Sequence, residues 1–403
     1  MNFFLLAWKN ILRNRRRSVI TILIAALGCA SILLAGGFAL YSYETLADSA
    51  AREYGHLTIA HKDFFTRDEE TPMQFGMQTS SAIMQKLRAD ARVRHILPRV
   101  SFSGLISNDD KSVIFIGIGA QLGDEVEVRG NFLKILEGSV GEARADAPRV
   151  LLGVDLARSL GARPGSVLTL LGTTTSGSIN AIDVVLSGIV STGWSEADKR
   201  LAFVDLEAAQ RLLVTDKVSS YSVYLADQAQ IPALRAELEA MGTELTFRPW
   251  QQQAFYYASV KGLYNRIFGI LGIIIALLVL FSVSNTLAMS VVERTREIGA
   301  LRALGTQPEE IVAQFVREGA LIGAAGVFIG NVVAGLLTFI LPSLGFEMPP
   351  PPGSSTGYPL LVSASLPMYL IVDVTIIALC ALAAWYASRN AARKPIMEAL
   401  RYV

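Results

Sequence analysis

Residues 290–330 read SVVERTREIGALRALGTQPEEIVAQFVREGALIGAAGVFIG and set the arrangement of the whole chain. They join two long apolar segments through a short connector that is dense in charge. Ile298, Leu301 and Leu304 recur every three residues in this connector, so we expect them to share one helical face, with charged residues off that face. Residues 306–309, TQPE, resemble a capping box with a proline in the first turn, which predicts the start of a new helix. The sequence therefore predicts a short amphipathic helix at the membrane surface, between two spans.

Four windows of roughly 20 apolar residues predict four membrane-spanning helices. The apolar share of the 403 residues, 52%, agrees with an integral membrane protein. The first window follows a basic stretch, as in a signal peptide, but it reaches full bilayer length, so we expect it to be retained as an anchor. The four windows are residues 19–41, 267–292, 315–341 and 366–388.

Lysine and arginine residues gather at one side of these four spans. Basic residues precede the first span and follow the second and the fourth, whereas the loop at residues 342–365 contains neither Lys nor Arg. By the positive-inside rule, both termini and the connector at residues 293–314 are expected in the cytoplasm. Residues 42–261 are then expected on the outer side of the membrane.

Residues 42–261 replace the long apolar runs with short β-rich segments and helical patches, which predicts an α+β domain. The region exceeds one typical domain, so we expect two lobes, with residues 110–205 inserted into a lobe made by both flanks. His56, His61 and His95 match no zinc pattern, and no nucleophile–histidine context is recognisable, so neither a metal site nor catalysis is expected. The net charge of +1 gives no indication of nucleic-acid binding.

The chain ends and the second external loop have features of their own. Residues 1–18 predict an amphipathic basic helix that lies on membrane lipid, where it either sets topology or docks a partner. Residues 389–403 predict a cytoplasmic tail. Residues 349–352 are four prolines, which predict a stiff spacer in preference to a ligand-contacting element.

Small and polar residues inside the spans predict close helix contacts. In the third span, Gly319 with Gly323 and Gly326 with Gly330 predict close backbone packing against a helix of this chain or of a second subunit. Asp373 lies inside the fourth span, where a carboxylate costs about 2.5–3.5 kcal/mol on insertion scales. It is a candidate intramembrane polar site, either a structural hydrogen bond or a functional group that faces a partner or a wet cleft.

Several segments resemble one known family. ERTREIGALRALG and EIVAQFVREGALIGAAGVFIG resemble the signature of the FtsX-like permeases, the MacB-type or type VII ABC transporter permeases. GHLTI after the first span, GVDLARSLGARPGSVLTLL and TGWSEADKRLAFVDLEAAQRLL resemble the periplasmic domain of that family. The layout, one span before a large domain and three spans after it, is most similar to the lipoprotein-releasing permeases of the family.

The resemblance implies a permease subunit that binds a separate cytoplasmic ABC ATPase. The chain has no G-x-x-x-x-G-K sequence followed by Ser or Thr, so we expect no cofactor on it, with ATP and Mg²⁺ on the partner. The resemblance further implies a homodimer or heterodimer of permeases in the bacterial inner membrane, Porter-like and Sabre-like periplasmic lobes, and a periplasmic acceptor or adaptor protein. The implied ATPase-coupling residues are Glu293, Arg294, Arg296, Glu297, Ile298, Gly299, Leu301, Arg302, Ala303, Leu304 and Gly305.

The implied mechanism is mechanotransmission, in which ATP hydrolysis on the partner subunit changes the conformation of the periplasmic domain. The expected role is extraction or export of a lipoprotein, a lipid or another hydrophobic envelope substrate, and the chain itself is not expected to be an enzyme. The alternative is a non-transporting signalling scaffold that activates a cell-wall hydrolase. The large external domain favours transport, because a small domain would be enough to hold an activator.

Overall fold

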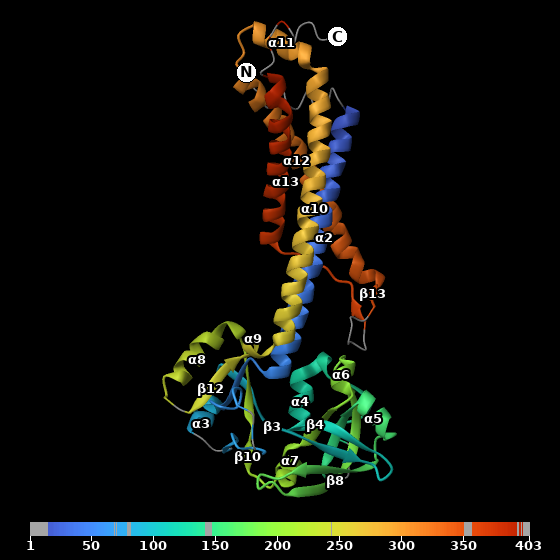
Figure 1. Cartoon of the computed structure of the whole chain (residues 1–403), viewed down its shortest axis with the longest axis vertical. Helices are drawn as coiled ribbons and strands as arrows, with labels where there is room; N and C mark the ends of the chain where they lie inside the picture. Colours follow the sequence, from blue (N-terminus) through green and yellow to red (C-terminus); the bar gives the residue numbers. More distant parts are fainter. Residues whose placement is uncertain are drawn as a thin grey trace. The chain divides into compact units, whose positions relative to one another are not determined.

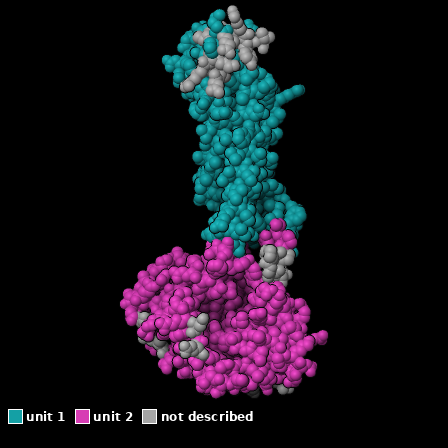
Figure 2. Space-filling view, in the orientation of Figure 1, with its two compact units in different colours: residues 1–44, 260–347, 359–403 teal, residues 45–259, 348–358 magenta. Residues whose placement is uncertain are grey.

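The chain divides into two compact units in the computed structural model, and Figure 2 colours them separately. One unit holds residues 1–44, 260–347 and 359–403, and the other holds residues 45–259 and 348–358. Most of the predicted N-terminal helix, most of the predicted C-terminal tail and residues 350–352 of the predicted spacer lie outside the described residues. The structure describes residues 15–67, 69, 71–78, 82–141, 147–242, 244–349, 357–392, 395 and 397.

Long helices make up the first unit, and four of them are long and apolar enough to cross a membrane. The first two extend well beyond their predicted windows, because the residues that continue them, such as ETLADSAARE after the first window, form helix readily but are not apolar. Hydropathy therefore marks the central part of each helix and not its ends. The helices are α2 (Arg15–Tyr54), α10 (Phe255–Glu293), α11 (Thr295–Ala303), α12 (Pro308–Leu344) and α13 (Leu366–Ala392) (Figure 1).

Glycines bring the backbone of α12 close to two neighbouring helices. A Cβ atom built on Gly319 or Gly323 would lie 3.0 Å or less from side chains of α13. A Cβ atom on Gly326 or Gly330 would lie 2.7 Å or less from side chains of α2. The two glycine pairs thus contact two different helices, and both helices belong to this chain.

A ten-stranded sheet forms the centre of the second unit. Its order is β12-β1-β11-β3-β4-β9-β6-β8-β5, and β7 pairs with both β3 and β8. Its strands are β1 (Leu57–His61), β3 (Val93–Ser107), β4 (Ser112–Ala120), β5 (Lys134–Gly138), β6 (Arg149–Gly153), β7 (Val167–Thr173), β8 (Ile179–Ser191), β9 (Leu201–Asp205), β11 (Ser220–Leu225) and β12 (Leu245–Pro249). Two short pairs lie apart from it: β2 (Met77–Gln78) with β10 (Lys217–Val218), and β13 (Glu347–Met348) with β14 (Tyr358–Pro359).

Short helices connect these strands. Each spans between three and nine residues, so packing on the sheet, not intrinsic propensity, has to stabilise it. The helices are α3 (Ala82–Ala89), α4 (Leu122–Arg129), η1 (Gly130–Phe132), α5 (Val154–Leu160), α6 (Ser195–Asp198), α7 (Leu206–Leu213), η2 (Gln228–Gln230), α8 (Ile231–Glu239) and α9 (Trp250–Gln253).

Strand β3 connects the two parts of the sheet. Its residues 93–99 pair with β11, and its residues 100–107 pair with β4. The flanks of the domain supply β1, β11 and β12, whereas residues 110–205 supply every strand from β4 to β9. The middle segment of the chain therefore extends the sheet of the flanks through one shared strand.

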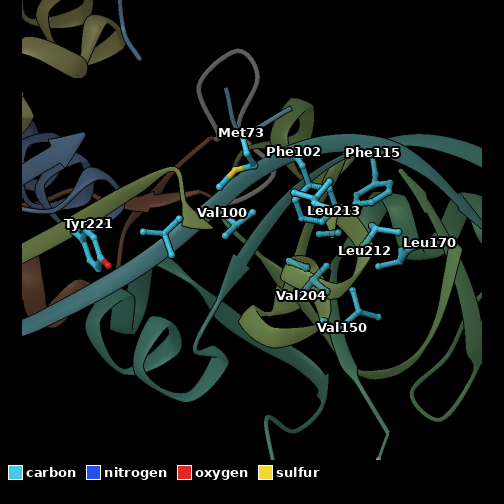
Figure 3. Packing of buried hydrophobic residues seen from close by; sticks show 14 of the residues in the cluster. Met73, Val100, Phe102, Phe115, Val150, Leu170, Val204, Leu212, Leu213 and Tyr221 are labelled. Carbon is cyan, nitrogen blue, oxygen red and sulfur yellow. The ribbon is translucent and has the colours of Figure 1, made fainter. Parts of the chain in front are cut away.

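The largest hydrophobic core runs along the sheet, and Figure 3 shows part of it, including Leu212 and Leu213 of α7. The rings of Phe102 and Phe115 meet edge to face with centroids 5.6 Å apart, and Leu212 of α7 is fully buried. The sequence LEAAQRLL forms this helix because its Ala and Leu residues fall on one face. Gly119 permits the close approach, since a Cβ atom there would lie 2.4 Å from the Cβ of Ala209.

A buried carboxylate joins α4 to β3. Glu125, 1% exposed, accepts hydrogen bonds from Arg99 at 2.7 and 3.2 Å and from Arg129 at 2.6 Å. Burial alone raises the pKa of Glu125, but the two guanidinium charges outweigh burial and hold that pKa below its ordinary value. Arg129 also lies over the ring of Phe203 at 5.0 Å. The carboxylate is thus charged and fully paired in the interior.

The same network satisfies the last carbonyl groups of α2, which have no partner within the helix. The carbonyls of residues 52, 53 and 54 accept hydrogen bonds from Tyr224, Arg99 and Ser222 respectively. The distances are 2.8 Å from the Tyr224 hydroxyl and 2.9 Å from the Ser222 hydroxyl, and Thr58 donates to the last carbonyl at 2.8 Å. Side chains of β1, β3 and β11 therefore fix the end of α2 to the sheet.

His56 follows this helix end directly. Its ring packs against Tyr224 with centroids 5.6 Å apart, and its Nδ1 accepts a hydrogen bond from the Leu225 backbone N–H at 2.9 Å. Burial and the charge of Arg52 lower the pKa of His56 from its usual 6.5, against a smaller opposite effect of Asp48. The folded protein therefore favours the neutral imidazole.

Replacing Gly326 with Leu should prevent α12 from packing on α2, because a Cβ atom alone would meet Ala25 at 2.6 Å. We expect lower accumulation in the membrane and a lower unfolding temperature, measured by immunoblot and by thermal shift in detergent. Gly335→Leu is the matched control on the same helix, since a Cβ atom there meets nothing within 4 Å. Equal behaviour of the two variants would contradict this helix packing.

Replacing Glu125 with Ala should destabilise the external domain by about 3–5 kcal/mol, because it leaves two buried guanidinium groups without their carboxylate. Denaturant unfolding followed by tryptophan fluorescence measures this loss. Glu196→Ala removes an exposed carboxylate that pairs with Lys199 and should leave stability unchanged. A Glu125→Ala protein as stable as the control would show that the buried cluster contributes nothing.

The hydrogen bond to His56 should weaken in acid. Because the folded-state pKa is depressed, the stability linked to neutral His56 is present above about pH 6.5 and is lost as the pH falls below that value. Hydrogen exchange at the Leu225 amide, corrected for the intrinsic rate, should rise in acid for the wild type and stay flat for His56→Gln. His61→Gln serves as the control and should behave like the wild type. A wild-type exchange rate that does not change with pH would contradict the link between protonation of His56 and this hydrogen bond.

Candidate functional site

Both ends of α11 are sharply defined. Arg294, at φ −99° and ψ 7°, interrupts the helix after Glu293 and separates α10 from α11. Gly305 has a φ of +97°, and its N–H donates to the carbonyl of Arg302 at 3.0 Å. Glycine suits this position because a side chain would be strained at a positive φ. The connector is therefore a helix with fixed boundaries.

The N-terminal cap of α12 lies one residue later than predicted. Gln307 is the N-cap, and its backbone N–H donates to the Glu310 carboxylate at 3.1 Å in a reciprocal capping box. The predicted box of Thr306 and Glu309 is wrong by one position. Pro308 fits the first helical position, where no N–H is needed, so the residue before it becomes the cap.

The inner face of α11 is held by an apolar cluster. Ile298, 4% exposed, packs with Val291 at the end of α10 and with Ile311 and Phe315 of α12. Gly299 is also buried. Ala392 of α13 completes the cluster, so four helices share it, and α11 cannot shift without disturbing α10 and α12.

An ion pair supports the same contact. Arg294, with 14% of its side chain exposed, donates to Glu297 and to Glu318, each at 3.2 Å. Its guanidinium also lies over the ring of Phe315 at 5.1 Å. The Glu318 side chain is 6% exposed, so Arg294 gives a buried carboxylate its counter-charge. Sequence reasoning missed Glu318, although an acidic residue inside an apolar stretch is a detectable signal.

The outer face of α11 is exposed and mixes apolar with charged groups. Leu304 is 85% exposed and Leu301 is 40% exposed, and Arg296 and Glu297 are exposed beside them. The predicted single face of Ile298, Leu301 and Leu304 is therefore wrong. Each helical residue turns about 100°, so a three-residue repeat drifts by about 60° per step and leaves the buried side after one step.

The predicted coupling residues therefore separate into groups. Arg294, Ile298 and Gly299 point inward and hold the helix in place. Glu293 forms an ion pair with Arg17 of α2. Arg302 is half-buried. The exposed members are Glu293, Arg296, Glu297, Leu301, Ala303, Leu304 and Gly305.

Asp373 belongs to a polar chain that crosses three helices. Its Oδ2 accepts a hydrogen bond from the Asn331 amide at 3.0 Å, and the Cys29 thiol donates to the amide oxygen of Asn331 at 3.7 Å. Within the part of the chain that the structure describes, Oδ1 of Asp373 is buried without a hydrogen-bond partner. The geometry gives Asp373 a structural contact, while a functional role for it stays a prediction.

The outer face of α11 offers a surface on which another protein can dock. Among the described residues, no group of three or more His, Cys, Asp or Glu side chains could hold a metal ion. The exposed apolar and charged side chains on a firmly held helix instead suit contact with another protein, where aliphatic groups are buried and charges set the orientation.

Comparison with known proteins identifies two domains. A family model described as the FtsX-like permease C-terminal matches residues 269–396, and a model of the MacB-like periplasmic core domain matches residues 18–241. The lipoprotein-releasing system transmembrane protein LolC of Neisseria meningitidis serogroup B is 28% identical over 326 residues, which cover 75% of this chain and 73% of that protein. LolC of Xylella fastidiosa is 26% identical over 330 residues, which cover 78% and 79%.

A solved structure of the periplasmic region of MacB from Actinobacillus actinomycetemcomitans is also similar, at 15% identity and a TM-score of 0.33. It covers 50% of this chain and 92% of that region. The two family models together account for the apolar helices and for the mixed α/β domain between the first two of them. Since the core-domain model alone spans more than half of the 403 residues, the chain belongs to the FtsX-like, MacB-type ABC transporter permeases, which makes it a multi-pass membrane protein with an extracellular domain.

Proposed function

We propose that this permease couples ATP hydrolysis on a separate ATPase subunit to a conformational change of its external domain. The change extracts or exports a lipoprotein, a lipid or another hydrophobic envelope substrate. The observation that carries the proposal is the outer face of α11, where Leu304 is 85% exposed on a helix whose inner face is fixed. An exposed leucine beside charged groups can be buried in a groove of a partner protein.

The inner contacts make α11 able to transmit force. Ile298 shares its cluster with α10 and α12, and Arg294 binds Glu318 of α12 at 3.2 Å. A force on α11 therefore acts on both long helices at once. α10 contains no proline from Phe255 to Glu293 and continues as one helix over this length. A continuous helix transmits displacement without a local hinge.

The distribution of Lys and Arg residues supports one orientation of the chain across the membrane. Arg296 and Arg302 lie in α11 and Arg294 directly precedes it, whereas residues 342–365 contain neither Lys nor Arg, which supports a cytoplasmic α11 and cytoplasmic termini. The ATPase, with its ATP and Mg²⁺, would then bind α11 from the cytosol. The external domain would lie in the periplasm, with a second permease subunit beside this one and an acceptor or adaptor protein beyond it.

The substrate class is supported by relatives. The proteins named LolC are called lipoprotein-releasing system transmembrane proteins, and they align over most of this chain. Their likeness favours a lipid-modified substrate over a soluble one. Mass spectrometry of molecules that copurify with a complex trapped by a hydrolysis-deficient ATPase identifies the substrate directly.

Replacing Leu301 and Leu304 with Asp should weaken ATPase binding at least about tenfold, because burial of one leucine contributes about 1.5–3 kcal/mol. The measurements are copurification of the ATPase with the tagged permease and stimulation of ATP hydrolysis in nanodiscs. Ile179→Asp alters an equally apolar residue, 80% exposed in the external domain, and should leave ATPase binding intact. Normal ATPase binding by the folded double variant would contradict the coupling role of α11.

A further inference from the structure

A groove of about 630 Å³ lies between the N-terminal part of α12 and the C-terminal part of α13. Two guanidinium groups, those of Arg317 and Arg389, line it against one carboxylate, that of Glu309. Its remaining lining is the apolar wall of α12 and one aromatic ring of α13. These residues are Pro308, Val312, Ala313, Val316 and Trp385.

The arginines lie where a membrane changes from headgroups to hydrocarbon. Arg317 stands at the start of the apolar part of α12, and Arg389 follows the apolar part of α13. Trp385 is 45% exposed and lies one helical turn from Arg389, whose guanidinium is 5.1 Å from the Trp385 ring. Tryptophan and arginine at this level are typical of the membrane interface.

The lining chemistry distinguishes among anions. Guanidinium groups bind phosphate oxygens with paired N–H donors, and basic pockets between membrane helices bind acidic headgroups. A soluble phosphate would use the two arginines but not the apolar wall of Val312, Ala313 and Val316. A phospholipid uses both, since its phosphate meets the arginines while the start of an acyl chain lies along the wall.

We propose that this groove binds an anionic phospholipid of the leaflet on the α11 side. The groove lies next to the apolar cluster that holds Ile298, because Val312 both lines the groove and packs against that cluster. A bound lipid therefore stabilises the contact between α11 and α12. This binding requires neither the ATPase nor a transported substrate, so the inference stands apart from the coupling function.

The test uses the full-length protein, purified in detergent, delipidated, and titrated with phosphatidylglycerol or phosphatidylcholine under native mass spectrometry. One arginine near an acidic lipid contributes about 1 kcal/mol, so Arg389→Gln should weaken phosphatidylglycerol binding about fivefold, and Arg317→Gln with Arg389→Gln about 25-fold. Phosphatidylcholine, whose choline cation offsets the charge of its phosphate, should bind more weakly than phosphatidylglycerol and should lose less affinity in either variant.

Arg266→Gln is the matched control, because it removes one exposed arginine from α10, before its apolar segment. It should retain wild-type affinity for phosphatidylglycerol. Equal affinity of the wild type for the two lipids, or an equal loss in Arg266→Gln and Arg389→Gln, would overturn the site. Displacement of the lipid by millimolar glycerol phosphate would show that the groove binds a soluble phosphate, and the lipid assignment would fail.

Discussion

The structure depends on how a buried carboxylate keeps its charge. Glu125 lies between Arg99 and Arg129 with almost no exposure, and its cost of burial is offset because both of its carboxylate oxygens accept hydrogen bonds from guanidinium groups. Arg99 at the same time donates to a carbonyl at the end of α2. One cluster thus unites a strand, a short helix and the end of a long helix. A neutral apolar core could pack equally well, but it could not satisfy the helix carbonyls.

The same principle recurs at α11. Arg294 neutralises the buried Glu318 and covers Phe315, so one arginine fixes the junction between two long helices. In both places a guanidinium group of one element makes a direct contact with an acidic group or a carbonyl of another element. Such contacts are directional, whereas apolar packing tolerates sliding. The points where helices must keep their relative orientation are thus the points where charges are buried.

The amino-acid pattern predicted the four apolar helices and the mixed external domain, because hydropathy and strand periodicity are local signals. It misplaced the cap of α12, since Thr306 and Gln307 offer nearly the same capping pattern and Pro308 decides between them. It also assigned Leu301 and Leu304 to the face of Ile298. That face depends on where Val291 and Phe315 lie, and no local spacing contains this information.

Other features could not be predicted for the same reason. Arg294 and Glu318 are 24 positions apart, and Arg99 and Tyr224 are 125 positions apart, so only the folded chain reveals each pair. The glycine pairs of α12 did predict close packing. One pair contacts α13 and the other contacts α2. This difference follows from the turn of the helix between Gly323 and Gly326 and from the positions of the two neighbouring helices.

The polar chain of Cys29, Asn331 and Asp373 restricts which motions the bundle allows. If α12 slid by one turn along α13, about 5.4 Å, the Asn331 amide would leave Asp373 and both groups would face hydrocarbon. A small tilt about that contact keeps the bond intact. Sliding of α12 along its own axis therefore costs more free energy than a tilt of α12 about this contact.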